Sequence, residues 1–356
     1  YLRRPENYPE LSEQVSRYCF RTLRSQAKHY AKVTERVLLT VEYTPGKAER
    51  QLYELLYAYI NQPEKRAFPE MNQYDLALRL LGLLGSSTAA ILQTIKGIVK
   101  RLQGLENAAD ELSQWQEIQT AAESIPQDAK AGELLTVLKQ GFSLMKKTGA
   151  KQKAVIFTES VETQKMLQNL LSDRYRTLAY NGSADYSVIR QFKEDGEVLI
   201  STDNGAKGFN LEEAAFIIHY DLPYNTLKLE QRIDRCHRLG QENDVLSVAF
   251  IDKNNFADVR KLELVNKRML VTDGVFGITD DVLGGFTDDV KAAFPVIAQR
   301  LRPRAQIEQA YRQTLSTHEE DNRQTVSAAE DILFTTFTKE LADKVKINPK
   351  YVNRRG

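Results

Sequence analysis

Short apolar runs alternate with amphipathic segments over residues 153–271, and this pattern predicts a layer of strands and helices. The runs are too short for helices and are rich in β-branched or aromatic residues. Expected strands are 154–157, 177–180, 198–201, 216–220 and 245–251, and expected helices are 161–172, 187–193, 226–237 and 256–270. Alternation of this kind is typical of an α/β fold with a buried parallel sheet.

The regions on either side favour helices. Helices are expected at 48–60, 76–84, 88–102, 107–123, 134–145, 305–315 and 330–345. Residues 37–43 alternate like a strand and end at a Thr-Pro-Gly turn, and the segment 273–285 is Gly-rich and turn-like. The sole tryptophan, Trp115, is expected to anchor packing rather than stack on a nucleic-acid base.

Composition excludes some classes of protein. Charged residues make up 27% of the chain and the net charge is +1, so any nucleic-acid surface must be local rather than global. No apolar run is long enough to predict a membrane span. The two cysteines, Cys19 and Cys236, give neither a disulfide framework nor a zinc spacing. This usage fits a reducing compartment, and a cytoplasmic location is expected.

Candidate chemistry follows two of the expected strands. The segment 201–211 combines glycines, hydroxyls and a lysine. In the helix at 226–237 and just beyond it, Gln231, Arg235 and Arg238 recur at spacings of four and three, which places them on one face. Guanidinium groups match phosphate oxygens, so this face beside such a loop suits a polyphosphate. A solvated helix face beside an ordinary loop explains the same spacing.

The residues of both segments resemble known motifs. Residues 231–241 read QRIDRCHRLGQ and resemble motif VI of the Swi/Snf-type helicase-like ATPases, while 201–211 is similar to their motif V. Residues 158–160 resemble motif IV and 181–183 the next family element. The resemblance is clear from about residue 153 to 285. It implies the carboxyl-terminal half of a bacterial Swi/Snf-like ATPase, with a RecA-like parallel-sheet lobe between mostly helical regions.

Three regions follow from this resemblance. Residues 1–150 would be a helical inter-lobe region, 151–271 the RecA-like lobe, and 272–356 a docking strap with a helical extension. The connection at 183–184 is short for the family, so a loop is either trimmed there or incomplete.

The resemblance also implies roles by position. Arg235 and Arg238 would be arginine fingers for ATP, and Gln231 would orient their helix or contact the nucleotide. Asp203, Gly208 and Asn210 would line the nucleotide-facing edge. Contacts with DNA phosphates are implied for Thr158, Ser160, Asn181, Ser183, Ser201, Thr202 and Lys207. A turn or a helix cap is the alternative for each hydroxyl, and a structural hydrogen bond is expected for His237.

A phosphate cradle of the form G-x-x-x-x-G-K-[ST] is missing. Gly46-Lys47 is followed by Ala48 and lacks the earlier glycine, and Asp110-Glu111 is interpreted as a solvated helix face. The chain is therefore expected to hold half of an ATP site. The resemblance implies that the cradle and the Mg²⁺ ligands lie in an upstream RecA-like lobe, and that this chain alone is inactive.

The favoured function is ATP-driven translocation on double-stranded DNA by the full-length protein. The alternative is a regulatory module that binds nucleic acid or protein without hydrolysis, and an RNA-directed helicase is a third hypothesis. The helical regions are expected to recruit protein partners, and no membrane partner is expected.

Overall fold

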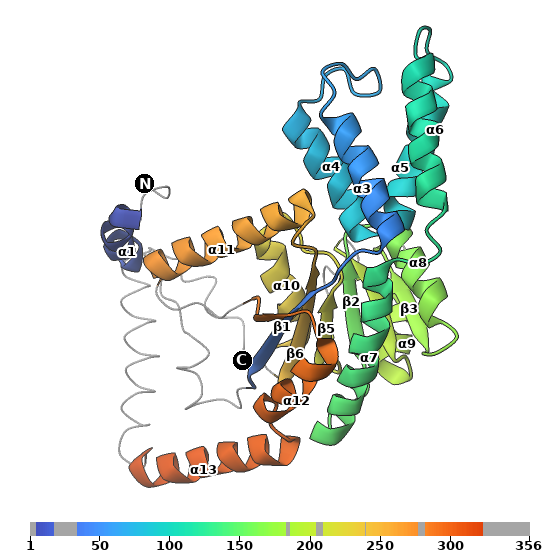
Figure 1. Cartoon of the computed structure of the whole chain (residues 1–356). Coiled ribbons are helices and arrows are strands. Elements are labelled where there is room, and N and C mark those ends of the chain that lie inside the picture. The colour runs from blue at the N-terminus through green and yellow to red at the C-terminus, as the bar shows by residue number, and fades with distance from the viewer. Residues whose placement is uncertain are drawn as a thin grey trace, which may run out of the picture.

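A seven-stranded parallel sheet forms the centre of the molecule (Figure 1). The computed structural model describes residues 5–17, 34–182, 186–203, 209–238, 240–276 and 282–322. The strand order is β3-β4-β2-β5-β6-β1-β7. The strands are β1 Arg36–Glu42, β2 Ala154–Thr158, β3 Thr177–Tyr180, β4 Val198–Thr202, β5 Phe216–His219, β6 Val245–Ile251 and β7 Gly285–Thr287. The predicted α/β class with a parallel sheet is confirmed.

Two strands join this sheet from outside the range predicted for the lobe. β1 pairs with β6 along its whole length, from Arg36 opposite Val245 to Glu42 opposite Ile251. The alternation at 37–43 correctly predicts a strand, but the sequence analysis assigned it to a mostly helical inter-lobe region. That assignment is corrected, because local alternation identifies a strand without identifying its neighbour. The other boundaries of the three regions stay predictions.

The short strand β7 extends the sheet by pairing with β1. The preceding residue, Gly284, lies so close to β1 that an added Cβ would be 2.0 Å from the carbonyl oxygen of Leu38. Thr40 Oγ1 donates a hydrogen bond to the Gly284 carbonyl at 3.3 Å. The described end of the predicted strap therefore lies along the edge of β1, and glycine permits this close approach.

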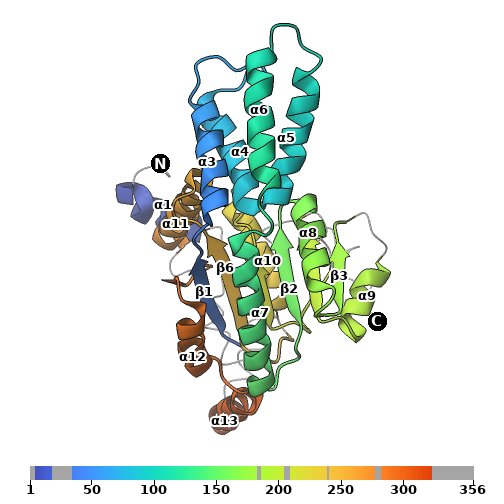
Figure 2. The ribbon, with the colours of Figure 1, turned by 45° about the vertical axis from the view of Figure 1, so that its right-hand side comes forward.

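Helices cover both faces of the sheet, so its central strands are apolar on both sides. One face packs against α7 (Ala129–Thr148), α8 (Val161–Leu171) and α12 (Val290–Arg300), and Figure 2 shows α7 crossing it. The opposite face packs against α9 (Ser187–Glu194), α10 (Thr226–Cys236) and α11 (Phe256–Phe276). Alternate strand residues enter the two cores: Ala154 and Ile156 enter the first, and Val155 and Phe157 the second.

A separate helical bundle is inserted between β1 and α7 and stands beyond the carboxyl ends of the strands (Figures 1 and 2). Its helices are α3 (Lys47–Ile60), α4 (Gln73–Ser86), α5 (Thr88–Leu102) and α6 (Ala109–Glu123). They enclose their own apolar core. Trp115 is fully buried there, with its ring centroid 4.7 Å from that of Tyr59, so its predicted packing role is confirmed.

The remaining described helices lie at the two ends of the chain. The short 3-10 helix η1 (Pro5–Asn7) leads into α1 (Tyr8–Ser16), which packs against α11, and α13 (Arg304–Asn322) follows α12. The helix expected at 305–315 is confirmed within α13, whereas the one expected at 330–345 lies outside the described residues. None of the described helices is both long enough and apolar enough to cross a membrane.

Candidate functional site

A buried carboxylate, Asp221, connects several segments at the carboxyl ends of the strands. It follows β5, is only 3% exposed, and accepts hydrogen bonds from Thr158 Oγ1 at 2.5 Å, Ser86 Oγ at 3.0 Å and the Glu159 amide at 2.9 Å. Lys130 Nζ lies 3.3 Å from its other oxygen. Burial alone would raise the pKa of Asp221, but the nearby lysines and these hydrogen bonds hold it below its usual value.

Lys130 is also fully enclosed by the protein. Its Nζ donates to the Gly85 carbonyl at 2.7 Å and lies 4.2 Å from the centre of the Tyr220 ring. The lysine therefore joins α7 to the end of α4 as well as to Asp221. The sequence pattern does not identify this lysine, because one lysine near the start of a helix gives no signal that it will be buried.

Arg232 of α10 completes this set. It is 2% exposed, and its Nη1 donates to the Asp221 carbonyl at 2.7 Å while its Nε donates to Asp203 Oδ1 at 2.7 Å. Lys228 Nζ lies 3.0 Å from Asp203 Oδ2. The carboxylate of Asp203, predicted to line the nucleotide edge, is thus occupied by two cations of α10. We call Ser86, Lys130, Thr158, Asp221 and Arg232 the Asp221 network.

The three predicted catalytic residues lie in a different environment, along α10 and just beyond its end. Gln231 and Arg238 are exposed and Arg235 is half-buried. Arg238 donates a hydrogen bond to Asn210 Oδ1, and the Arg235 carbonyl accepts one from the Leu211 amide at 2.8 Å. The structure therefore brings the end of motif V against motif VI. Within the described parts of the chain, no carboxylate pairs with the guanidinium of Arg235 or Arg238.

His237 holds the end of α10 against the start of β1. Its Nδ1 accepts a hydrogen bond from Arg36 Nε at 2.6 Å, and its Nε2 lies 2.9 Å from the Thr34 carbonyl. With Nδ1 accepting, Nε2 carries the proton and donates it to that carbonyl. Arg36 also pairs with Asp234 at 2.8 Å. The structural hydrogen bond expected for His237 is confirmed.

Gln241, the last residue of motif VI, also makes structural hydrogen bonds. Its buried amide donates to the carbonyls of Glu212, Ala214 and Cys236 at 2.9–3.3 Å. Gly240 precedes it with a φ of 104°, a left-handed conformation that favours glycine. These two residues position the turn after α10 rather than present functional groups to a ligand.

The hydroxyls predicted to hold DNA phosphates differ in accessibility. Thr158 and Ser201 are fully buried; Thr158 donates to Asp221, and Ser201 Oγ donates to the Thr202 carbonyl at 3.1 Å. Their side chains do not reach the surface. Ser160 is the N-cap of α8, with its Oγ accepting from the Thr163 amide at 3.2 Å, so the helix-cap alternative describes it.

Two further candidates lie beside them at the same edge of the sheet. Asn181, after β3, is half-buried, and Thr202, at the end of β4, is buried with 5% of its surface exposed. The predicted residues Ser183, Lys207 and Gly208 lie outside the described residues. The edge formed by the ends of β3, β4 and β2 thus brings several of the predicted polar groups into one row.

Comparison with known proteins identifies a helicase domain. Residues 133–240 match the helicase conserved C-terminal domain family. The chain is 32% identical to the uncharacterized ATP-dependent helicase YqhH of Bacillus subtilis over 204 residues, which cover 56% of this chain and 34% of that protein. It is 27% identical to the RNA polymerase-associated protein RapA of Vibrio vulnificus over 186 residues, covering 50% of this chain and 17% of that protein.

A eukaryotic relative and one solved structure extend this set. The helicase swr1 of Aspergillus fumigatus is 30% identical over 148 residues, which cover 38% of this chain and 8% of that protein. The crystal structure of the C-terminal part of the Fun30 ATPase domain has a TM-score of 0.45 at 16% identity, covering 68% of this chain and 97% of that one. The chain thus spans about a third or less of these curated relatives, and over residues 133–240 it contains a helicase C-terminal domain that is similar to those of Swi/Snf-type helicases.

Proposed function

We propose that this chain is the carboxyl-terminal half of an ATP-dependent translocase of the Swi/Snf type that moves on double-stranded DNA. Its lobe supplies arginine fingers and contacts with the DNA backbone. A first RecA-like lobe, outside this chain, supplies the phosphate cradle and the ligands of Mg²⁺. The ATP site is therefore divided between two lobes, and this chain alone does not hydrolyse ATP.

The observation that carries this proposal is the contrast among the arginines of motif VI. Arg232 is neutralised by Asp203, whereas Arg235 and Arg238 have no carboxylate partner among the described residues. Asn210 orients Arg238 through a neutral amide, which leaves the positive charge of the guanidinium available. Such groups fit the γ-phosphate of ATP, and arginine fingers contribute about 10³–10⁵ in rate.

Sequence-independent DNA contact is supported by the order of the strands. Ser160, Asn181 and Thr202 follow or end β2, β3 and β4, which are neighbours in the sheet. Hydroxyl, amide and backbone N–H groups in such a row can hold phosphates without reading bases. We include Ser183 and Lys207 in this proposed surface on the strength of the motif resemblance.

Protein partners are proposed for the helical regions. One relative is named an RNA polymerase-associated protein. The inserted bundle α3–α6 has its own core and projects beyond the carboxyl ends of the strands, which suits a separate contact surface.

ATP hydrolysis tests the proposal. We would measure it on this chain and on a natural form that includes a further RecA-like lobe, with double-stranded DNA, single-stranded DNA or RNA. Arg238→Ala is compared with Arg260→Ala, because Arg260 is a partly exposed arginine outside the motifs that pairs with Glu263. We expect an inert short chain, a longer form stimulated most by double-stranded DNA, and loss of turnover only in Arg238→Ala.

Two other results would replace the proposal. Stimulation by RNA in preference to DNA would favour an RNA-directed helicase. No hydrolysis in the longer form, or hydrolysis that does not depend on Arg238, would favour a regulatory binding module.

A further inference from the structure

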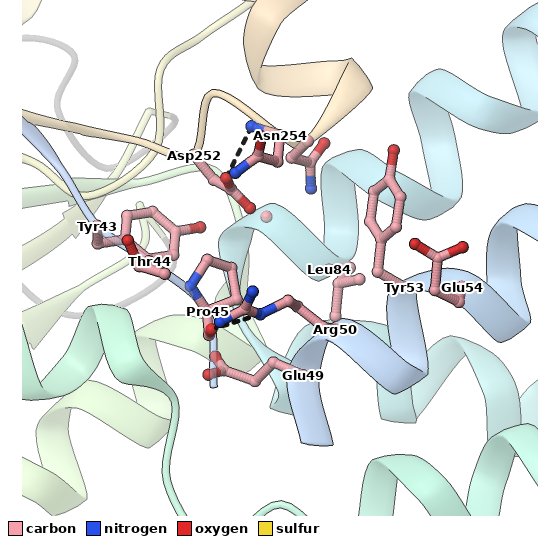
Figure 3. Close-up of a pocket in the computed structure, with 12 residues that line it drawn as sticks. Tyr43, Thr44, Pro45, Glu49, Arg50, Tyr53, Glu54, Leu84, Asp252 and Asn254 are labelled. Carbon is pink, nitrogen blue, oxygen red and sulfur yellow. Dashed lines mark hydrogen bonds between the residues drawn. The ribbon is translucent and has the colours of Figure 1, made fainter. Parts of the chain in front are cut away.

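A cavity of about 350 Å³ lies between the sheet and the inserted bundle, away from the helicase motifs (Figure 3). Tyr43 and Asp252 reach it from just beyond the ends of β1 and β6, and Arg50, Tyr53 and Glu54 line it from α3. We call it the Asp252 pocket. Its volume is at the small end of the range of ligand sites, roughly 300–1,000 Å³. A small molecule or one inserted side chain therefore fits it.

The lining of the Asp252 pocket is more acidic than basic. Asp252, Glu49 and Glu54 line it, and Arg50 is the one cationic side chain among the described lining residues. A further carboxylate, Asp258, lies directly behind; it accepts a hydrogen bond from the Asp252 amide at 3.1 Å and pairs with Lys261, whose Nζ is 3.9 Å away. The pocket therefore repels phosphate groups and attracts cations.

Asp252 leaves one carboxylate oxygen open toward this cavity. The residue is only 5% exposed, and its Oδ1 accepts from the Asn254 amide at 2.8 Å. No partner of Oδ2 is found in the described part of the chain, and the carboxylate points into the space between the strand ends and α3 (Figure 3). Burial, with help from Asp258, raises the pKa of Asp252. A buried carboxylate of this kind gains stability when a cation approaches.

The nearest buried lysine does not supply that cation. Lys130 Nζ lies 5.6 Å from the centre of the Tyr43 ring, but its ion pair is with Asp221, at 3.3 Å. The rings of Tyr43 and Tyr53 add π faces, which attract ammonium and guanidinium groups. The carboxylate oxygen of Asp252 that lacks a partner among the described residues, the acidic lining and the two tyrosine rings thus all favour a cationic ligand.

We propose that the Asp252 pocket binds a protonated amine or guanidinium group, from a free polyamine or from a basic side chain of a partner. Such a ligand contacts Asp252 and Tyr43 on the sheet and Glu54 and Tyr53 on the bundle, so it fixes one against the other. This site goes beyond the proposed ATP and DNA functions, because none of the motif residues lines it.

Titration calorimetry at low salt tests the proposal on the intact chain. The probes are spermidine and agmatine as free amines and a capped Gly-Arg-Gly peptide as a basic side chain. Asp252→Asn removes the charge with little change of shape, and we expect it to weaken binding roughly tenfold or more. Glu64→Gln is the matched control, because Glu64 is exposed in the loop after α3 and does not line the pocket.

A second variant, at an exposed residue, tests binding without the risk that a buried substitution disturbs folding. Glu54 is exposed at the rim, so Glu54→Lys leaves the core intact and should abolish binding of every probe. Binding of spermidine or agmatine alone identifies a free amine as the ligand, and binding of the peptide identifies a partner's side chain. The proposal is overturned if no probe binds the wild-type chain, or if Asp252→Asn and Glu54→Lys bind as the wild type does.

Discussion

The two ends of motif VI make a direct comparison. At the inner end, Arg232 lies in the Asp221 network, where buried charges and hydroxyls pair with one another. At the outer end, Arg235 and Arg238 have no carboxylate partner among the described residues, and Arg238 donates a hydrogen bond to the neutral amide oxygen of Asn210. Arginines of the same motif are thus either buried and paired with a carboxylate or more exposed and, in the described part of the chain, without one.

Under the proposed function, this difference separates residues that maintain the fold from residues that bind a ligand. A buried charge is tolerated only when it is paired and hydrogen-bonded, so the Asp221 network must be complete in the folded protein. An exposed arginine keeps its hydration and costs little, and it can exchange water for phosphate oxygens later. We therefore expect changes at the inner end to reduce stability and changes at the outer end to reduce turnover.

The largest effect on stability is expected at the centre of the network. Asp221→Ala leaves Lys130 charged and buried without its carboxylate partner, and the Ser86 and Thr158 hydroxyls lose the acceptor that they share. We expect a loss of about 3–5 kcal/mol in the free energy of unfolding, measured by urea denaturation. Asp173→Ala, at an exposed position after α8, should stay within about 0.5 kcal/mol. If the two variants lost the same free energy of unfolding, the buried Asp221 network would contribute no more to stability than an exposed surface residue.

The effect of pH on stability through His219, which is buried near Arg232, is expected to be of intermediate size. His219 is fully buried, with Nε2 3.1 Å from Ser247 Oγ, and burial with the nearby charge of Arg232 holds its pKa well below 6.5. The unfolded chain therefore takes up a proton near pH 6.5 that the folded chain does not. Stability should be full above that pH and should fall by up to about 1.4 kcal/mol per unit below it.

Denaturation at about pH 7.5 and about pH 5.5 measures this effect. His219→Gln, which cannot titrate, should show a smaller loss between the two values than the wild type. An unchanged loss would mean that other groups set the acid sensitivity of this region.

The smallest effect is expected at the cap of α8. Ser160→Ala removes the hydroxyl that accepts from the Thr163 amide and should cost about 1 kcal/mol, measured by thermal unfolding. Ser160→Asn, which can still cap, should restore most of it. Ser172→Ala at the other end of α8 should change little, because that hydroxyl is exposed and donates to the carbonyl of Asn169, three residues back. A Ser160→Ala variant with unchanged stability would leave DNA contact as the main role of this hydroxyl.

Much of the fold could be predicted because its elements are strongly patterned. The alternation of apolar runs and amphipathic segments located β2 to β6 and α8 to α11, since each strand is buried and each helix has one apolar face. Two details were beyond local patterns. β7 is too short to give a signal, and α11 runs to Phe276 through Gly274, past the end expected at residue 270.

The site could be predicted only in part. Spacing placed Gln231, Arg235 and Arg238 along one face, but spacing does not distinguish them from Arg232, which the fold buries. The Asp221 network was missed because its members come from distant segments, including α4 and α7 of regions that sequence analysis treated as separate. The one available signal was Asp221 itself, an acid that closely follows the apolar run 216–218, where a buried partner is required.

The most direct test measures unfolding and ATP turnover on the same two variants, Arg232→Ala and Arg235→Ala, in a form that contains both lobes. Arg232→Ala should lose about 2–3 kcal/mol of stability, because Asp203 and the Asp221 carbonyl lose their donor. Arg235→Ala should unfold like the wild type but turn over ATP about 10³-fold or more slowly. Normal turnover in Arg235→Ala, or a loss of stability as large as that of Arg232→Ala, would contradict the division of motif VI into a structural and a catalytic end.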